Sequence, residues 1–395
     1  LIADEPTTAL DVTVQAQIMA LLAELREETG MAMIFITHDI GLVAGIADRI
    51  MVMQNGVAVE QGEADAVLDN PQHDYTKHLL RAVPHFTSGK AVRNDGRRAE
   101  PHEPIVKVDD LVVRFPVGKA WFKPKGAIHA VDGVSFDLVP GETLAIVGES
   151  GCGKSTTARA LLGLNSKTRG EIVTGSGHSV RPVQMVFQDP FASLNPRLTV
   201  EALLAEPAIA NGQRRDDTLR ARMAFLLDRV GLPQDALSRY PHQFSGGQRQ
   251  RLCIARALML NPDVVVLDEA VSALDVSVQA KVLELLVDLQ QEFGLAYLFI
   301  SHDMAVVERI AHRIAVMFAG QIVEMGEARA VLSDPQHAYT KRLIAAVPAI
   351  ERRKQRFAVD MTQVPSLVRP PGFEPPPAQW REAGQDHRVR IEDTV

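Results

Sequence analysis

The chain has 395 residues, of which 46% are hydrophobic and 23% are charged, and its formal net charge is −7. This length predicts two to three domains, and the composition is typical of a folded globular protein rather than a disordered or fibrous one. The mild acidity argues against nucleic acid as the main partner, and two cysteines are too few for a disulfide framework. This cysteine usage favours a cytoplasmic protein. No apolar run approaches the roughly 20 residues that cross a bilayer, so we expect no membrane-spanning segment.

An internal repeat organises the chain. The segment DEPTTALDVTVQAQ at residues 4–17 recurs as DEAVSALDVSVQAK at residues 268–281, a spacing of 264 positions. The match runs without a gap over some 84 residues, and about half of the aligned positions are identical. Such self-similarity indicates duplication.

The repeat predicts the domain boundaries. We interpret residues 1–86 as the C-terminal part of a first domain and residues 105–348 as a complete second copy. Because the chain opens without methionine and apparently within a strand, we expect an upstream portion to be missing. Residues 87–104 are polar and charged, which is typical of a linker. Residues 349–395 form a Pro-rich tail without a strand or helix pattern, which we expect to be mostly extended or disordered.

The second copy has an α/β pattern. An alternating segment, Ile105–Phe115, predicts an edge strand that ends at Pro116. Further strands are predicted at residues 134–138, 143–147, 184–188 and 264–268, and a helix follows the Gly-rich turn after residue 147. Residues 200–260 read as helices. The sequence therefore predicts a helical lobe inserted into a strand-rich nucleotide fold.

The segment GESGCGKST at residues 148–156 fits the P-loop pattern and lies between a predicted strand and a predicted helix. Gly151 and Gly153 let backbone N–H groups point at phosphate, and the helix N-terminus adds a favourable dipole. Lys154 would neutralise the β- and γ-phosphates, and Ser155 offers a hydroxyl to Mg²⁺. Cys152 lies where a thiolate is favoured, and we hypothesise that its alkylation blocks ATP binding.

Two further motifs point to the same chemistry. Asp268 and Glu269 end a buried apolar strand, where the aspartate suits water-mediated Mg²⁺ binding and the glutamate suits a general base. The segment SGGQRQ at residues 245–250 opens a helix with Ser245 as its N-cap. Its exposed backbone predicts a second helix terminus that faces phosphate.

The order of these motifs resembles the nucleotide-binding subunits of ABC transporters. Residues 187–200 and the end of the second copy are similar to the oligopeptide, dipeptide and glutathione importer ATPases, in their fused two-domain form. The resemblance implies a P-loop NTPase fold of the ABC ATPase type, with a helical subdomain, in one complete and one partial copy.

The resemblance also implies a role for each matching residue. Catalytic roles fall to Glu269, His302 and Gln188, and in the first block to Glu5 and His38. Contacts with ATP fall to Gly148, Glu149, Ser150, Gly151, Cys152, Gly153, Lys154, Ser155, Thr156, Phe115, Ser245, Gly246, Gly247, Gln248 and Asp275. Metal ligands would be Ser155, Gln188, Asp268 and Asp4. Phe115 would stack on adenine, with Trp121 and Phe122 as rivals; all three also suit a structural role.

The implied cofactors are ATP and Mg²⁺. The implied partners are membrane permease subunits, a periplasmic or extracellular solute-binding protein, and a second ATPase domain in trans or within a longer chain. The resemblance also implies a location at the cytoplasmic face of the bacterial inner membrane. There the protein would drive uptake of oligopeptides, dipeptides, glutathione or a related solute. Since the tail has no cysteine, we expect no iron–sulfur centre.

In this family each ATP lies between the P-loop of one domain and the signature segment of the opposite domain, which is SGGQ at residues 245–248 here. We therefore expect this chain to bind MgATP through its second copy but to hydrolyse it poorly unless two copies pair. Two alternatives stay open at this point. One is a twin-domain ABC protein of translation or repair, and the other is a non-catalytic interaction module.

Overall fold

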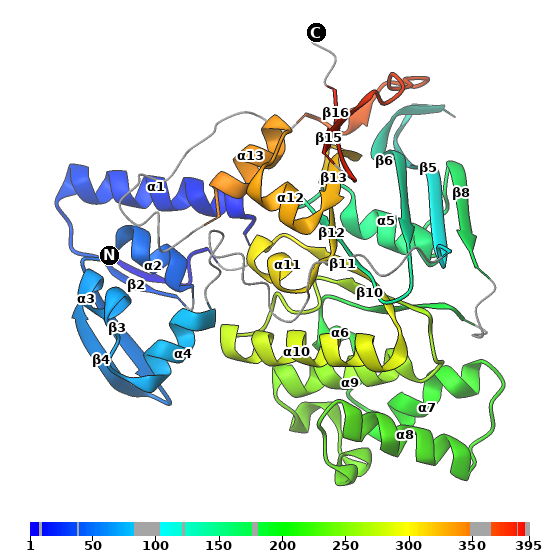
Figure 1. The fold of residues 1–395 in the computed structure, drawn as a ribbon, viewed down its shortest axis with the longest axis horizontal. Coiled ribbons are helices and arrows are strands. Elements are labelled where there is room, and N and C mark those ends of the chain that lie inside the picture. Colours follow the sequence, from blue (N-terminus) through cyan, green and yellow to red (C-terminus); the bar gives the residue numbers. More distant parts are fainter. Residues whose placement is uncertain are drawn as a thin grey trace.

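The computed structural model describes residues 1–7, 10–37, 39–82, 103–120, 123–175, 181–347, 365–384 and 386–391. The first block lies at one side of the molecule and the second copy forms the rest (Figure 1). The first block contains β1 (Ile2–Asp4), α1 (Val12–Thr29), β2 (Ile34–Ile36), α2 (Ile40–Ile46), β3 (Arg49–Gln54), β4 (Val57–Glu63), α3 (Ala64–Asp69) and α4 (Asp74–Ala82). Its strands form two separate pairs, β1 with β2 and β3 with β4.

An eight-stranded sheet is the centre of the second copy, with the order β15-β16-β13-β12-β7-β11-β10-β9. Its strands are β7 (Thr143–Val147), β9 (Val183–Val186), β10 (Val264–Asp268), β11 (Ala296–Ser301), β12 (Arg313–Phe318), β13 (Gln321–Glu327), β15 (Trp380–Gly384) and β16 (His387–Arg390). The strands β12, β7, β11, β10 and β9 are parallel neighbours. Every residue of β7, β10 and β11 is buried, as expected of parallel strands covered on both faces.

A four-stranded antiparallel sheet, in the order β14-β6-β5-β8, packs beside the central sheet. It contains β5 (Val106–Ala120), β6 (Lys123–Leu138), β8 (Arg169–Thr174) and β14 (Val368–Arg369). Helix α5 (Lys154–Leu161) lies between the two sheets and contacts both (Figure 1). The P-loop that precedes α5 is therefore held between two layers.

The expectation that the first strand of this sheet is an edge strand ending at Pro116 is wrong. Strand β5 pairs with β6 on one side and β8 on the other, and it continues through Pro116 to Ala120. Strand pairing with β8 stops at Val112, and among the described residues β6 is the strand that pairs with β5 beyond that point. A proline is tolerated there because it removes no hydrogen bond from an open side.

The helical lobe is confirmed, and it follows β9 in the chain. It contains α6 (Pro190–Ser193), α7 (Val200–Ala210), α8 (Asp217–Arg229), η1 (Gln234–Ser238), η2 (Pro241–Gln243) and α9 (Gly246–Leu258). The remaining helices are α10 (Val276–Phe293), α11 (Met304–Ile310), α12 (Ala328–Ser333) and α13 (Ala338–Ala345). None of the helices in the described ranges combines the length and apolar surface that crossing a bilayer requires.

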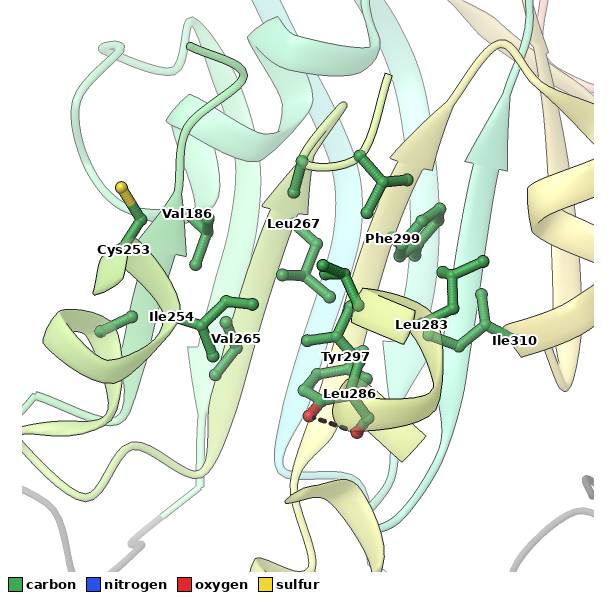
Figure 2. Close-up of a cluster of buried hydrophobic side chains, with 14 of the residues drawn as sticks. Val186, Cys253, Ile254, Val265, Leu267, Leu283, Leu286, Tyr297, Phe299 and Ile310 are labelled. Carbon is green, nitrogen blue, oxygen red and sulfur yellow. Dashed lines mark hydrogen bonds between the residues drawn. The ribbon is translucent and has the colours of Figure 1, made fainter. Parts of the chain in front are cut away.

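The main core joins the helical lobe to one face of the central sheet. Leu267 on β10 and Phe299 on β11 are fully buried there, against Leu283 and Leu286 of α10 (Figure 2). The Tyr297 hydroxyl donates a 2.9 Å hydrogen bond to the Leu286 carbonyl, which satisfies the one polar atom of this buried ring. The strand that carries the acidic pair is thereby fixed against α10.

The expectation of a tail without strands is wrong over residues 365–384 and 386–391, where three strands form and pair with the sheets. Strand β14 adds to β6, and the hairpin of β15 and β16 adds to β13 at the edge of the central sheet. His387 Nε2 lies 2.7 Å from Glu324 Oε1, and both residues are buried. These strands pair with segments far away in the chain, so no local pattern reveals them. The predicted linker falls mostly outside the described residues.

Candidate nucleotide site

The loop of residues 148–156 has the geometry of a phosphate-binding loop. It joins β7 to α5, as the P-loop motif requires. At Gly153, φ is +111° and an added Cβ would lie 2.1 Å from the Ala130 carbonyl oxygen on β6. At Gly148 an added Cβ would lie 2.2 Å from the Met317 carbonyl oxygen. Glycine is required at both positions because the backbone of the loop touches neighbouring backbone directly.

Lys154 lies folded inside this loop. Its ammonium donates to the carbonyl oxygens of Gly148 at 2.7 Å and Glu149 at 2.9 Å, and the residue is buried. Both acceptors are neutral, so the positive charge has no carboxylate among these bonds. A phosphate group in the loop would supply that negative charge.

Ser155 and Asp268 form the part of the site suited to a divalent cation. The Ser155 hydroxyl donates a 2.8 Å hydrogen bond to Asp268 Oδ1, and burial raises the pKa of the aspartate above its ordinary value. A buried carboxylate beside a hydroxyl gains from a cation, because the charge compensates desolvation. Mg²⁺ prefers such oxygen donors and usually takes its remaining ligands from water and phosphate.

Three residues from different elements converge on one carboxylate. Gln188 Nε2 donates to Glu269 Oε2 at 2.6 Å, and His302 Nδ1 lies 3.4 Å from Glu269 Oε1. The hydrogen bond from His302 lowers the pKa of Glu269, and the same contact raises the pKa of His302. Both shifts favour the charged forms, a carboxylate beside an imidazolium. The structure thus brings together the glutamine, glutamate and histidine that the sequence placed more than 30 residues apart.

The signature segment belongs to the helical lobe rather than to the P-loop's layer. Ser245 caps α9, and Gln248 bonds back to it: Gln248 Oε1 accepts from the Ser245 amide at 3.0 Å. An added Cβ on Gly247 would lie 2.3 Å from Val278 Cγ1 of α10. Gly247 is therefore required for close packing of two helices, whereas the sequence suggested only that it exposes backbone.

The predicted residues of the first block lie differently from their counterparts. Asp4 and Glu5 are exposed at the end of β1, whereas Asp268 and Glu269 lie against Ser155 and His302. His38 lies outside the described residues, as do Trp121 and Phe122, the rivals of Phe115. Phe115 itself lies on β5 and is 39% exposed.

Two residues of the first block contact the P-loop, and the sequence did not single them out as site residues. The Ser150 hydroxyl donates to Asp11 Oδ1 at 2.8 Å, and the Thr13 hydroxyl donates to Glu149 Oε1 at 2.8 Å. The counterpart of Asp11, Asp275, is predicted to contact ATP but instead caps α10 by accepting from the Val278 amide at 3.0 Å. The repeat gave the signal for Asp11, since it aligns with Asp275.

Tyr339 is a further residue that sequence reasoning missed. Its hydroxyl accepts a 2.9 Å hydrogen bond from the Glu149 amide, and its ring lies 4.3 Å from that of Phe318. Burial raises the pKa of Tyr339, so it stays neutral. The tyrosine supports the P-loop from the first turn of α13, in the segment PQHAYTK at residues 335–341, which matches PQHDYTK at residues 71–77.

The prediction that Cys152 favours the thiolate is wrong. The residue is buried, and burial raises the pKa of its thiol despite the nearby Lys154. Desolvation of the charged form outweighs the attraction of the ammonium and the helix N-terminus. Cys152 therefore acts as a small buried side chain within the loop.

Comparison with known proteins defines the class. A sequence model of the ABC transporter family matches residues 131–272. A model of the oligopeptide/dipeptide transporter C-terminal region matches twice, at residues 59–106 and 323–373. The two matches start 264 positions apart, which is the spacing of the internal repeat.

Relatives and solved structures agree with that class. The chain is 49% identical to the glutathione import ATP-binding protein of Pectobacterium atrosepticum, covering 98% of this chain and 68% of that one. It is 51% identical to the Escherichia coli protein of the same name, covering 90% of this chain and 62% of that one. The structure of cbiO1 from Clostridium perfringens, part of an ABC transporter complex, is similar with a TM-score of 0.50 and 27% identity. The match covers 59% of this chain and 92% of the cbiO1 chain.

A second solved structure shows the fold alone. MJ1267, an ATP-binding cassette of an ABC transporter in its ADP conformation, has a TM-score of 0.51 and 23% identity. The match covers 61% of this chain and 99% of that one. The predicted P-loop NTPase fold of the ABC ATPase type is thereby confirmed.

The fold and the loop of residues 148–156 define an ABC ATPase. The chain belongs to the family of ATP-binding subunits of ABC importers, which includes the glutathione import proteins above. It binds and hydrolyses ATP, and it energises uptake through separate membrane subunits. The expectation drawn from the motif order is confirmed, and the alternatives of a translation or repair factor and of a non-catalytic module are set aside.

Proposed function

We propose that ATP binds with its phosphates in the loop of residues 148–156 and that Glu269 is the general base of hydrolysis. The observation that supports this most directly is the convergence of Gln188 and His302 on the Glu269 carboxylate, beside the Ser155–Asp268 pair. A water oxygen attacks the γ-phosphorus while the bond to the bridging oxygen breaks. Glu269 takes the proton of that water, and Lys154 balances charge on the phosphates.

Mg²⁺ is part of this proposal. Ser155, Asp268 and Gln188 would hold the ion, which supplies charge neutralisation on the phosphate oxygens when bound. His302 acts through Glu269, because its contact keeps the carboxylate charged and oriented. A charged, correctly placed carboxylate is what proton removal from water requires.

The domain organisation supports pairing of copies. We infer that residues 1–86 are the C-terminal part of a first ABC ATPase domain, that 87–104 is a linker and that 349–395 is a tail on the complete domain of residues 105–348. Because the P-loop and the Ser245–Gln248 turn belong to different lobes of one domain, the signature of one domain would close over ATP bound to another. Hydrolysis by this chain is then slow unless two copies pair, and its rate per chain rises with chain concentration.

The solute and the remaining partners follow from the relatives. Several similar proteins are named for glutathione import, and two segments match an oligopeptide/dipeptide transporter region. We infer that the chain drives uptake of glutathione, oligopeptides, dipeptides or a related solute. A solute-binding protein outside the membrane would deliver it, and the ATPase would act at the cytoplasmic face of the bacterial inner membrane.

The test is nucleotide affinity after removal of the P-loop ammonium. The change is Lys154→Ala, and the matched control is Lys167→Ala, an exposed lysine outside the loop. We expect the first variant to lose at least about tenfold in affinity for MgATP, because a charge-assisted contact to phosphate disappears. The control should keep the native affinity. Native affinity in Lys154→Ala would contradict the placement of the phosphates.

A further inference from the structure

The C-terminal strand β14 places an apolar side chain in the same cross-strand row as the aromatic residue predicted to contact adenine, with one strand, β6, between them. In the antiparallel sheet, Phe115 of β5 pairs with Ile128 of β6, and Ile128 pairs with Val368 of β14. Residues directly opposite each other in antiparallel strands share a face of the sheet. Phe115, Ile128 and Val368 therefore form one row across three strands, which we call the apolar row. Phe115 is 39% and Val368 is 51% exposed, and Ile128 is half-buried.

The apolar row lies close to the P-loop. The loop touches β6 at Ala130, whose carbonyl oxygen an added Cβ on Gly153 would approach to 2.1 Å. Ile128 is two residues farther along the same strand, a distance of about 7 Å. A nucleotide with its phosphates in the loop is therefore long enough for its base to reach the apolar row.

The opposite face of the sheet holds β14 in place. Arg114 of β5 donates to both oxygens of Glu374 at 2.6 and 2.7 Å, and it also contacts Asp132 at 3.3 Å. The Phe373 ring meets the ring of His129 edge-on, at 5.7 Å between centroids. These contacts fix the tail on one face of the sheet, which leaves the face of the apolar row open.

We propose that Val368 is a third member of the surface that binds the adenine base of ATP. This inference rests on the proposed function, in which the phosphates occupy the loop of residues 148–156, and on the expectation from the family resemblance that Phe115 stacks on adenine. An aromatic ring at one end of a row, continued by two aliphatic side chains, offers an apolar surface, and a base has a flat apolar face to bury. The tail therefore contributes to nucleotide binding as well as to the sheet.

A pair of valines tests the proposal. The change is Val368→Ser, and the control is Val173→Ser on β8 of the same sheet, where the valine is 47% exposed. We expect Val368→Ser to weaken the affinity for MgATP about three- to tenfold, because apolar contact with the base is lost. Its affinity for magnesium tripolyphosphate, which has no base, should stay native. Val173→Ser should change neither affinity.

A second variant moves the strand instead of the side chain. An Ala at position 126 would put its Cβ 2.6 Å from the Arg369 carbonyl oxygen, so Gly126→Ala must push β14 away from β6. The same loss for ATP, with native affinity for tripolyphosphate, is expected. Equal weakening of both ligands by Val368→Ser would indicate a structural role and overturn the proposal.

The outcome for Phe115→Ala separates this inference from the proposed function. If Phe115→Ala weakens ATP binding and Val368→Ser leaves it native, the proposal for Val368 is wrong while the base still lies on Phe115. If neither variant changes the affinity, the placement of the base itself is wrong. Native ATP affinity in Val368→Ser overturns the inference whatever Gly126→Ala shows.

Discussion

The two copies of the repeat have the same local structure. Helices α1, α2 and α3 and strands β3 and β4 recur as α10, α11, α12, β12 and β13 with boundaries 264 positions apart. Each copy ends its long helix at a glycine with positive φ, Gly30 or Gly294. Glu5 and Glu269 both have a positive φ, of 44° and 48°. Such detail in two different surroundings shows that the repeat encodes its own elements and turns.

Burial differs sharply between the same two copies. Ile36 is 48% exposed whereas Ile300 is fully buried, and Met53 is 57% exposed whereas Met317 is fully buried. In the second copy β7 lies between β11 and β12 and bonds to both. In the described part of the first block, β1–β2 and β3–β4 are separate pairs. Burial of the repeated elements therefore depends on strands outside the repeat, such as β7. The repeat itself encodes only the elements that pack against those strands.

The largest expected difference between the copies is in catalysis. Glu269→Gln should lower the rate of MgATP hydrolysis by about 10²–10⁴ and leave ATP binding intact, because it removes the general base. Glu5→Gln changes the aligned residue, which is exposed at the end of β1, and should keep the rate within about twofold. Phosphate release and ATP affinity are measured for both variants. A comparable loss of rate in the two would break the comparison, because it would make the first block catalytic.

Identical side chains test the difference in burial. Ile300→Ala should lower the free energy of unfolding by about 2–5 kcal/mol, since it leaves a cavity beneath β11. Ile36→Ala removes the same atoms from a half-exposed position and should cost less than about 1 kcal/mol. Urea unfolding of each variant gives the two values. Equal costs would show that Ile36 is covered in solution by something that packs as β7 does.

The sequence predicted what local patterns and fixed spacing encode. The strands of residues 143–147 and 264–268 and the lobe of residues 200–260 were found because buried strands are apolar runs and helices have a regular period. The resemblance supplied Gln188 and His302 as partners of Glu269, and the structure brings the three together.

What the sequence could not predict depends on contacts between distant segments. The strand at Val368 pairs with β6, which lies more than 200 residues earlier in the chain. Asp11 reaches Ser150 while the aligned Asp275 caps its own helix, although the sequences around the two aspartates are similar, ALDVTVQA and ALDVSVQA. The raised pKa of Cys152 follows from burial by residues that the loop sequence does not contain.

Asp275 and Asp11 are expected to have smaller effects, which differ in kind: one on helix stability and the other on the P-loop. Asp275→Ala removes the cap of α10 and should cost about 1 kcal/mol of unfolding free energy. Asp11 makes no side-chain cap on α1 and bonds Ser150 instead, so Asp11→Ala should barely affect that helix. It should speed hydrogen exchange at the P-loop. Amide exchange followed by mass spectrometry separates the outcomes, and faster exchange along α1 in Asp11→Ala would contradict them.

The smallest expected effect is the pH dependence of the Glu269–His302 pair. The lowered pKa of Glu269 gives stability that is present above its ordinary value of 4.5 and is lost as pH falls through the folded value. The raised pKa of His302 gives stability that is present below its ordinary value of 6.5 and is lost as pH rises through the folded value. Both contributions are therefore complete between those ordinary values, and they total about 1 kcal/mol or less for a partly exposed pair.

Urea unfolding at a series of pH values gives the difference in unfolding free energy between the native chain and His302→Gln. This advantage of the native chain should be largest in this window and smaller above it. An advantage over His302→Gln that stays constant from acid to alkaline pH would mean that His302 acts by packing and not by its charge.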